Sequence, residues 1–362
     1  MGLHASASAR ALAVTVVTAA LLAAGCSRTE PPPLRYPSAA SDARPADTAP
    51  VVASAPPTST TAPVEPTPPV ATVEVAPPAE EGPPLLSFQR GTSLGHAAGL
   101  HKVNDKLRLS ASAALVVDKD NGEVLVQRNE QAVLPIASLT KLMTGMIVTE
   151  AGLSMDEEIT ISQGDVDEER HSRSRLRVGT TLSRGDALRI ALMSSENRAA
   201  HALGRTFPGG MNVFVQRMNA RARTLGMKNT TYVDPTGLST ANQSTALDLA
   251  AFLKVAAKNR VLTHYSTTRE HLVPLARGRN LQYRNSNRLV KNPKWDIDLQ
   301  KTGYIIEAGW CVAMEARVDG RNVLMVLLDA GSAGNRVSDA ERLKQLVKAL
   351  PESTRAASLN RR

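Results

Sequence analysis

The chain has 362 residues and is basic, with 43 Lys and Arg against 34 Asp and Glu, which gives a formal net charge of +9. Aromatic residues make up only 3% of it, too few for base-stacking surfaces, so we predict no nucleic-acid partner. A basic surface suits an anionic polymer or a membrane surface, but a solvated basic exterior without any partner explains the charge equally well.

Residues 1–26 are predicted to be a secretory signal peptide. Arg10 is followed by an apolar run from Ala11 to Ala24 that is too short to span a bilayer. The segment ends in Leu-Ala-Ala-Gly-Cys at residues 22–26, which resembles the lipobox of bacterial lipoproteins and implies that Cys26 is lipidated. The leucine lies one position earlier than usual, so ordinary signal cleavage stays open. We therefore expect an exported, periplasmic protein, anchored to a membrane through its N-terminal lipid.

The rest of the chain divides by composition into three parts. Residues 27–90 are rich in Pro, Ala and Thr, and such a composition cannot form a buried core. We therefore expect a disordered tether that lets an anchored domain act far from its membrane. Residues 100–352 have the turn signals and apolar periodicity of one globular domain, and residues 353–362 form a tail.

The globular part begins and ends with predicted strands. Segments 113–117 and 123–127 flank Asp-Asn-Gly, and segments 310–318 and 322–329 enclose Asp-Gly, which are two hairpin signals. A helix is predicted from residue 136 to Gly152.

Helices are predicted between and after these strands. Ser183 is expected to cap one helix, residues 244–258 form another, and Ser338 is expected to cap the last. The apolar face of that last helix is predicted to contain Leu343, Leu346, Val347 and Leu350. We therefore predict a mixed α/β chain of the α+β kind, in which helices flank an antiparallel sheet and a helical subdomain is inserted, with a site in the groove between the two parts.

Three short motifs occur in order within this domain: Ser138-Leu-Thr-Lys141, Ser195-Glu-Asn197 and Lys301-Thr-Gly303. The first two are common by chance and Lys-Thr-Gly is rarer, so the weight lies in their conjunction and order. Together they are typical of an acyl-serine enzyme that acts on D-alanyl peptides and is blocked by penicillins.

The first motif supplies a nucleophile and a base. One helical turn separates Ser138 from Lys141, so the hydroxyl and the amine can meet. Serine needs an adjacent base, and a lysine can serve if desolvation or a nearby cation favours its neutral form. Lys301 is a candidate for that cation.

The other motifs supply polar groups for the substrate. The Ser195 hydroxyl and the Asn197 amide can relay a proton and hold a carbonyl. Lys301 and Thr302 can bind a carboxylate, and Gly303 lets a peptide backbone approach closely.

With these motifs, the chain from about residue 100 to 350 resembles the low-molecular-mass penicillin-binding proteins of the D-alanyl-D-alanine carboxypeptidase and endopeptidase family. The matching segments are residues 135–143, 194–200, 233–239 and 299–304. The resemblance implies a β-lactamase/transpeptidase-like fold, peptidoglycan stem peptides as partners and β-lactam antibiotics as covalent inhibitors.

The resemblance also implies residue roles. Ser138 would be the acylated nucleophile and Lys141 its base, with Ser195 and Asn197 assisting. Lys301 and Thr302 would grip substrate, and the amide of Tyr304 would complete the oxyanion hole. We assign Asp234, in the matched segment Asp-Pro-Thr-Gly, a structural turn role.

Because the chain ends soon after the last predicted helix, without the β-rich C-terminal domain of many carboxypeptidases, it resembles the endopeptidase branch, which hydrolyses the D-alanyl to diaminopimelyl crosslink. A carboxypeptidase stays open. A β-lactamase ranks lower because no Glu lies between Glu196 and Glu270 to drive deacylation. A lipoprotein that binds wall peptides without cleaving them is a further alternative.

No metal or cofactor is predicted, because the chain has no His-Glu-x-x-His helix and no clustered cysteines. Cys311 is expected to be a buried strand cysteine, and His201 a packing or surface residue. The sequence leaves the oligomeric state open.

Overall fold

The computed structural model describes residues 91–103, 106–275 and 278–351. The predicted signal peptide with Cys26, the tether and the tail 353–362 lie outside the described residues.

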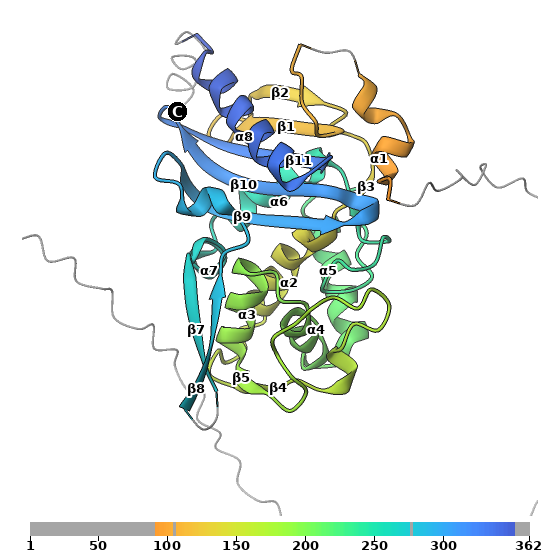
Figure 1. Cartoon of the computed structure of the whole chain (residues 1–362), viewed down its shortest axis with the longest axis vertical. Coiled ribbons are helices and arrows are strands. Elements are labelled where there is room, and N and C mark those ends of the chain that lie inside the picture. The colour runs from red at the N-terminus through yellow and green to blue at the C-terminus, as the bar shows by residue number, and fades with distance from the viewer. Residues whose placement is uncertain (1–90, 104–105, 276–277, 352–362) are drawn as a thin grey trace, which may run out of the picture. The chain divides into compact units, whose positions relative to one another are not determined.

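A five-stranded antiparallel sheet forms the upper part of the molecule in Figure 1, with strand order β2-β1-β11-β10-β9. Its first and last strands in the chain become neighbours, because β1 pairs with β11 along its whole length. The strands are β1 (Ala113–Asp118), β2 (Val124–Arg128), β9 (Asp296–Ile305), β10 (Gly309–Val318) and β11 (Arg321–Ala330).

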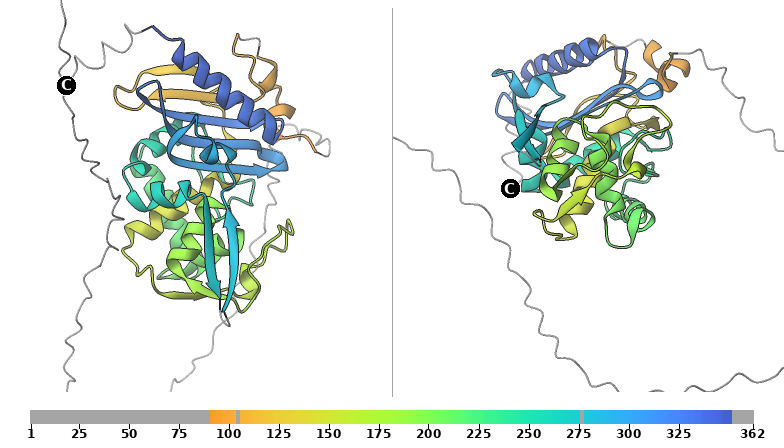
Figure 2. Two further views of the ribbon diagram at one scale, coloured as in Figure 1. Left: turned by 60° about the vertical axis from the view of Figure 1, so that its left-hand side comes forward. Right: turned by 60° about the horizontal axis from the view of Figure 1, so that its bottom comes forward.

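Both faces of the sheet are buried. Alternate side chains of β11 enter two apolar clusters, so Val326 belongs to one and Met325 to the other. Helix α8 (Ala333–Lys348) covers the outer face, and α6 (Ala246–Ala256) packs on the inner face. Figure 2 shows α8 alone on one side of the sheet and the other long helices beyond the opposite side.

The helical part surrounds α2 (Thr140–Glu150), of whose 11 residues nine are buried. A helix that is apolar on all sides needs neighbours on all sides. Here they are α3 (Arg184–Met193), α4 (Asn197–Arg205), α5 (Gly210–Thr224) and α7 (Arg260–Thr267).

Short elements connect these parts. The paired strands are β3 (Leu134–Pro135) with β6 (Gln243–Ser244), β4 (Glu158–Thr160) with β5 (Thr181–Ser183), and β7 (Glu270–Leu275) with β8 (Arg279–Arg284). The short helices are α1 (Leu94–Ala97), η1 (Leu100–Lys102), η2 (Ala137–Leu139), η3 (Gln163–Asp165), η5 (Arg288–Lys291) and η6 (Ile306–Ala308). Within the described ranges, no helix combines the length and apolarity that crossing a bilayer requires.

Both predicted hairpins are confirmed as β1–β2 and β10–β11, and Ser183 caps α3 by accepting a hydrogen bond from the Asp186 amide. The predicted cap at Ser338 is wrong. Helix α8 starts six residues earlier, because the Ser332 hydroxyl caps it by accepting from the Asn335 amide. Asp339 instead accepts from the amides of Ser110 and Ala111.

The predicted apolar face of α8 is correct only in part. Leu343 and Val347 are buried against the sheet, whereas Leu346 is 36% exposed. Only the stripe of α8 that faces β10 and β11 is covered by the sheet.

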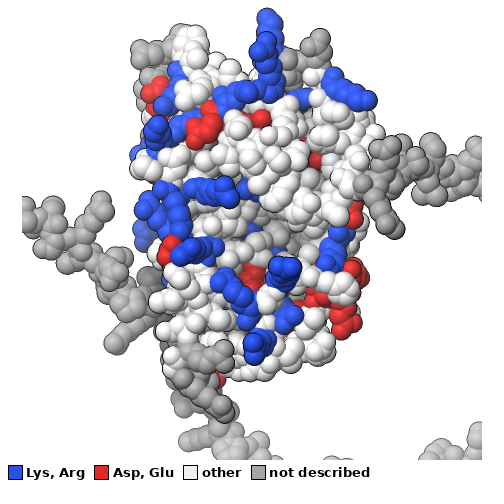
Figure 3. Space-filling model, viewed as in Figure 1, with Lys and Arg blue, Asp and Glu red and all other residues white. Residues whose placement is uncertain are grey.

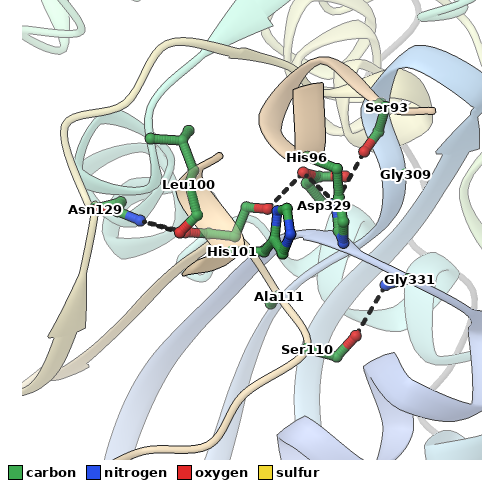
Figure 4. Close-up of polar contacts among 12 residues, drawn as sticks. Ser93, His96, Leu100, His101, Ser110, Ala111, Asn129, Gly309, Asp329 and Gly331 are labelled. Carbon is green, nitrogen blue, oxygen red and sulfur yellow. Dashed lines mark hydrogen bonds and ion pairs between the residues drawn. The ribbon is translucent and has the colours of Figure 1, made fainter. Parts of the chain in front are cut away.

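The Asp329 carboxylate, at the end of β11, connects helix α1 to the sheet. Its Oδ2 accepts from the Ser112 hydroxyl at 2.6 Å and contacts His96 Nδ1 of α1 at 3.0 Å. The His96 ring stacks on that of His101 with a centroid distance of 4.3 Å, and Figure 4 shows this cluster. Asp329 is only 1% exposed, so the contact joins α1 to the buried core of the sheet.

Candidate active site

Ser138 lies in η2, the short helix that leads directly into α2. Ala137 before it has a φ of 47°, a left-handed conformation that turns the chain sharply from β3 into the helix. Two glycines from distant segments pack closely against this turn. A Cβ on Gly237 would lie 1.9 Å from the Ala137 carbonyl oxygen, and one on Gly303 would lie 3.1 Å from the Ser138 backbone nitrogen.

Lys141 reaches the nucleophile as the helical spacing predicts. Its Nζ donates to Ser138 Oγ at 2.8 Å, to Asn197 Oδ1 at 2.7 Å and to the Thr236 carbonyl at 2.6 Å. The amine therefore joins the first motif to the second and to the Asp-Pro-Thr-Gly turn.

Burial lowers the pKa of Lys141 to about 7, because α2 is enclosed by other helices. The nearby carboxylates of Asp234 and Glu196 act in the opposite direction and limit the shift. Lys301 also has a pKa well below its usual value, through burial first and then through the charges of Lys141 and Arg336. Desolvation, rather than a neighbouring cation, is thus the main cause that favours a neutral Lys141.

Ser195 and Asn197 lie where α3 ends and α4 begins. Ser195 has a φ of 63°, a strained conformation for a residue other than glycine, and its side chain lines the cavity beside Ser138. Asn197 is held from both ends, since its Oδ1 accepts from Lys141 and its Nδ2 donates to Ser172 Oγ at 3.0 Å.

The third motif lies inside the edge strand β9. Thr302 Oγ1 is 2.8 Å from Ser286 Oγ, and Thr302, Gly303 and Tyr304 line the cavity with Ser138. Lys301 is fully buried behind them, and its Nζ donates to the Thr302 carbonyl at 2.7 Å.

These residues surround a cavity of about 440 Å³, large enough for a small-molecule ligand. Two arginines line it, Arg170 and Arg336. Arg336 of α8 is 6% exposed and lies over the ring of Trp310 at 5.7 Å. Further wall residues that the motifs do not include are Ser172, Leu238, Ser286, Ile306 and Trp310.

One ion pair begins at the cavity wall. Arg170, in the loop after η3, makes two hydrogen bonds to the Glu307 carboxylate of η6, at 2.9 and 3.1 Å. Lone arginines have no sequence signature, so neither Arg170 nor Arg336 could be singled out from the sequence. Both are brought to the cavity by elements far from the motifs.

Asp234 has the structural turn role predicted for it. Its Oδ1 accepts from the amides of Thr236 and Gly237 at 2.6 and 2.8 Å, which shapes the turn. The same turn presents the Thr236 carbonyl to Lys141, so it also positions the amine, which the sequence did not indicate.

The remaining predicted residues lie away from the cavity. Cys311 is fully buried in β10 as predicted, and burial raises the pKa of its thiol to about 12. The ring of His201 in α4 pairs with Asp165 at 2.7 Å. Within the described ranges, no group of three or more His, Cys, Asp or Glu side chains could hold a metal ion.

The arrangement is suited to acyl transfer. A hydroxyl hydrogen-bonded to an amine that is half neutral near pH 7 is an activated nucleophile. The hydroxyl faces a cavity with amide, hydroxyl and guanidinium donors. These groups can hold a carbonyl and a carboxylate.

Known proteins with this sequence pattern are peptidases. Residues 101–332 match the family described as D-alanyl-D-alanine carboxypeptidase. The D-alanyl-D-alanine endopeptidase of Pseudomonas aeruginosa is 45% identical over 259 residues, which are 70% of this chain and 84% of that protein. The D-alanyl-D-alanine endopeptidase of Escherichia coli is 39% identical over 237 residues, 65% of this chain and 76% of that protein.

A solved structure has the same fold. Penicillin-binding protein D2 from Listeria monocytogenes, in its cefotaxime-bound form, is 31% identical and covers 67% of this chain and 99% of its own, with a TM-score of 0.58. The predicted fold class, an antiparallel sheet flanked by helices with an inserted helical part, is therefore confirmed. The chain is a serine hydrolase that belongs to the D-alanyl-D-alanine carboxypeptidase family.

Proposed function

We propose that this protein hydrolyses D-alanyl bonds in peptidoglycan through an acyl-serine intermediate, with the D-alanyl to diaminopimelyl crosslink as its principal substrate. The hydrogen bond of 2.8 Å between Lys141 Nζ and Ser138 Oγ, with the Lys141 pKa lowered to about 7, carries the proposal. The endopeptidase name of both relatives favours the crosslink over a terminal D-alanine.

The reaction divides into two steps. Ser138 Oγ attacks the D-alanyl carbonyl carbon while its proton passes to Lys141, and the oxyanion lies between the amides of Ser138 and Tyr304. The C–N bond then breaks as the leaving amine takes the proton, which leaves an ester on Ser138. Lys141 then deprotonates a water molecule, which attacks the ester carbonyl; the acyl–oxygen bond breaks, the Ser138 oxygen regains the proton, and the second product is released.

Polar groups around the nucleophile hold the substrate. Asn197 and Ser195 position the reacting carbonyl and assist the proton transfers, and Thr302 with Arg336 binds the carboxylate next to the scissile bond. Lys301 supports this site from behind through its bond to the Thr302 carbonyl. Gly303 lines the cavity, and its lack of a side chain leaves room for the turn that contains Ser138.

The substrate can be identified by incubating the purified globular part with a crosslinked muropeptide dimer and, separately, with a monomeric pentapeptide. Mass spectrometry should show loss of the dimer and appearance of its two monomers. Conversion of pentapeptide to tetrapeptide with an intact dimer would instead identify a carboxypeptidase.

The Ser138→Ala variant separates catalysis from binding. It should bind the dimer but leave it uncut and should form no covalent adduct with fluorescent penicillin. Unchanged cleavage by this variant would exclude the acyl-serine mechanism. Rapid turnover of a chromogenic cephalosporin by the unaltered protein would favour the β-lactamase alternative.

We further propose that the protein is exported and held at a membrane by a lipid on Cys26. The lipobox-like sequence at residues 22–26 supports this proposal. Metabolic labelling with a fatty acid should mark the wild-type protein and not Cys26→Ala; equal labelling of both would exclude this anchor.

A further inference from the structure

A second cavity opens from the catalytic cavity on the side of Ser195. It has a volume of about 610 Å³ and shares two wall residues with the catalytic cavity, Ser172 and Ser195. We call it the arginine groove, after its wall residues Arg173, Arg175 and Arg198.

The groove is positively charged. Arg173 and Arg175 are exposed, and within the described part of the chain no carboxylate forms an ion pair with any of its three arginines. The carboxylate on its wall is that of Glu196, which is 7% exposed and is engaged by the Arg198 amide. On the face of the molecule drawn in Figure 3, Lys and Arg side chains gather over the helical part, below the sheet.

The groove is also preformed. The Arg175 guanidinium lies 4.0 Å from the centroid of the Tyr283 ring, and Arg198 Nη1 donates to the Leu176 carbonyl at 2.7 Å. These contacts fix the loop that contains Arg173 against β8 and α4. An anionic ligand would therefore meet two guanidinium groups, those of Arg175 and Arg198, whose positions are already set, which lowers the entropy cost of binding.

The base of the catalytic site is connected to the groove by hydrogen bonds. Lys141 donates to Asn197, and Asn197 donates to Ser172, which lines both cavities. A leaving amine must approach the group that returns its proton. A leaving group held near Lys141 can therefore extend past Ser172 and Ser195 into the groove.

The two possible leaving groups differ in what they would place there. Free D-alanine is smaller than the ligands for which a cavity of this size is typical. The carboxylate on the diaminopimelyl carbon that bears the released amine is the one assigned above to Thr302 and Arg336. The stem peptide behind it has further carboxylates, which are free to reach the groove. Arginine binds carboxylates through paired hydrogen bonds, so the groove matches the crosslinked leaving group in size and charge.

We propose that the arginine groove binds the carboxylates of the leaving stem peptide and so determines the preference for crosslinked substrate over a terminal D-alanine. This proposal rests on the proposed function and names the residues that select its substrate. Arg173 and Arg175 are the binding residues to test.

The experiment compares the double variant Arg173→Gln/Arg175→Gln with a control, Arg177→Gln/Arg223→Gln, that removes the same charge from exposed residues outside the groove. For each, kcat/KM on the muropeptide dimer is divided by the rate constant of acylation by penicillin. We expect this ratio to fall roughly tenfold in the groove variant, as for the loss of a charged hydrogen bond, and to stay at the wild-type value in the control.

A dimer whose leaving-stem carboxylates are amidated tests the ligand side. The wild type should cleave it roughly tenfold more slowly than the free-acid dimer, and the groove variant should show no further loss. An unchanged ratio in the groove variant would overturn the proposal, as would an equal fall in the control. A wild-type protein that is acylated by penicillin but leaves the dimer intact would instead overturn the endopeptidase function, and the groove proposal with it.

Discussion

Lys141 is a fully buried amine whose hydrogen-bond partners all accept. Water is excluded from α2, so the charged form loses solvation that the neutral form hardly needs. Lys141 can therefore be neutral, as a base must be, close to pH 7. The Ser-x-x-Lys spacing alone does not ensure this.

The rate of acylation should depend on pH through this lysine. Its pKa of about 7 means that the neutral, base-competent form is in the minority below pH 7 and predominates above it. We expect the acylation rate constant for fluorescent penicillin to rise with pH through about 7 and then level off. Lys141→Arg, which stays charged, should be slower by roughly 100-fold or more at every pH. A wild-type rate that falls as pH rises from 6 to 8 would contradict the base role.

Gly237 tests the backbone packing around the nucleophile. Its φ of 79° is unfavourable for other residues, and a Cβ there would meet the Ala137 carbonyl oxygen at 1.9 Å. Gly237→Ala should therefore displace η2 and reduce acylation by more than roughly tenfold. Gly226→Ala is the control, since its φ is also positive but nothing lies within 4 Å of its Cβ. Equal acylation rates in the two variants would show that the contact is not required.

At the scale of elements, the site is made where a loop of the helical part meets the turn between β9 and β10. The pair Arg170–Glu307 joins them beside the cavity. The Glu307 carboxylate has a pKa below its usual value despite burial, because Arg170 hydrogen-bonds it. Arg170 and Glu307 are 26% and 22% exposed, so solvent weakens the pair.

We therefore expect Glu307→Gln to change the free energy of unfolding by less than about 1 kcal/mol. The variant should nevertheless bind substrate more weakly, because the loop is no longer held at the cavity wall, so KM for the dimer should rise severalfold while kcat changes less. Urea unfolding and steady-state kinetics measure the two effects separately. A large loss of stability, or a fall in kcat alone, would show that the pair acts otherwise.

At the scale of the whole molecule, the fold depends on contacts between the first and the last strands of the described globular part. The sheet joins β1 and β2 to β9–β11 from the other end of the domain, and Asp329 fastens α1 to the sheet (Figure 4). Removal of the Asp329 carboxylate would leave the buried Ser112 hydroxyl without its acceptor and would leave His96 with only its hydrogen bond to Ser93.

Asp329→Ala should lower the free energy of unfolding by about 2 kcal/mol or more. Ser93→Ala is the matched control, since Ser93 contacts His96 only at the edge of the same cluster. Chemical denaturation of both variants measures the difference. Equal stabilities would mean that the N-terminal segment contributes little to the fold.

The sequence predicted the elements well where local chemistry is strong. The Asp-Asn-Gly and Asp-Gly turns specify hairpins through backbone conformations that few other residues adopt, and the cap at Ser183 is a local hydrogen bond. It failed at Ser338, since a serine inside a helix and a serine at its start look alike in sequence. The sequence analysis also missed the β7–β8 hairpin, because no Asn-Gly or Asp-Gly turn lies between these two strands.

Ser138, Lys141, Asn197 and Thr302 were chosen from the sequence because motif spacing and residue chemistry are local. The order of the motifs along the chain, with the resemblance they carry, also indicated the fold and the class of reaction. Tertiary structure alone decided what surrounds them. Three features depend on segments that lie far apart in the chain: the burial that lowers the Lys141 pKa, the position of Arg336 of α8 at the cavity wall, and the arginine groove beside Ser195. Desolvation and charge proximity act through space, and spacing along a chain does not contain them.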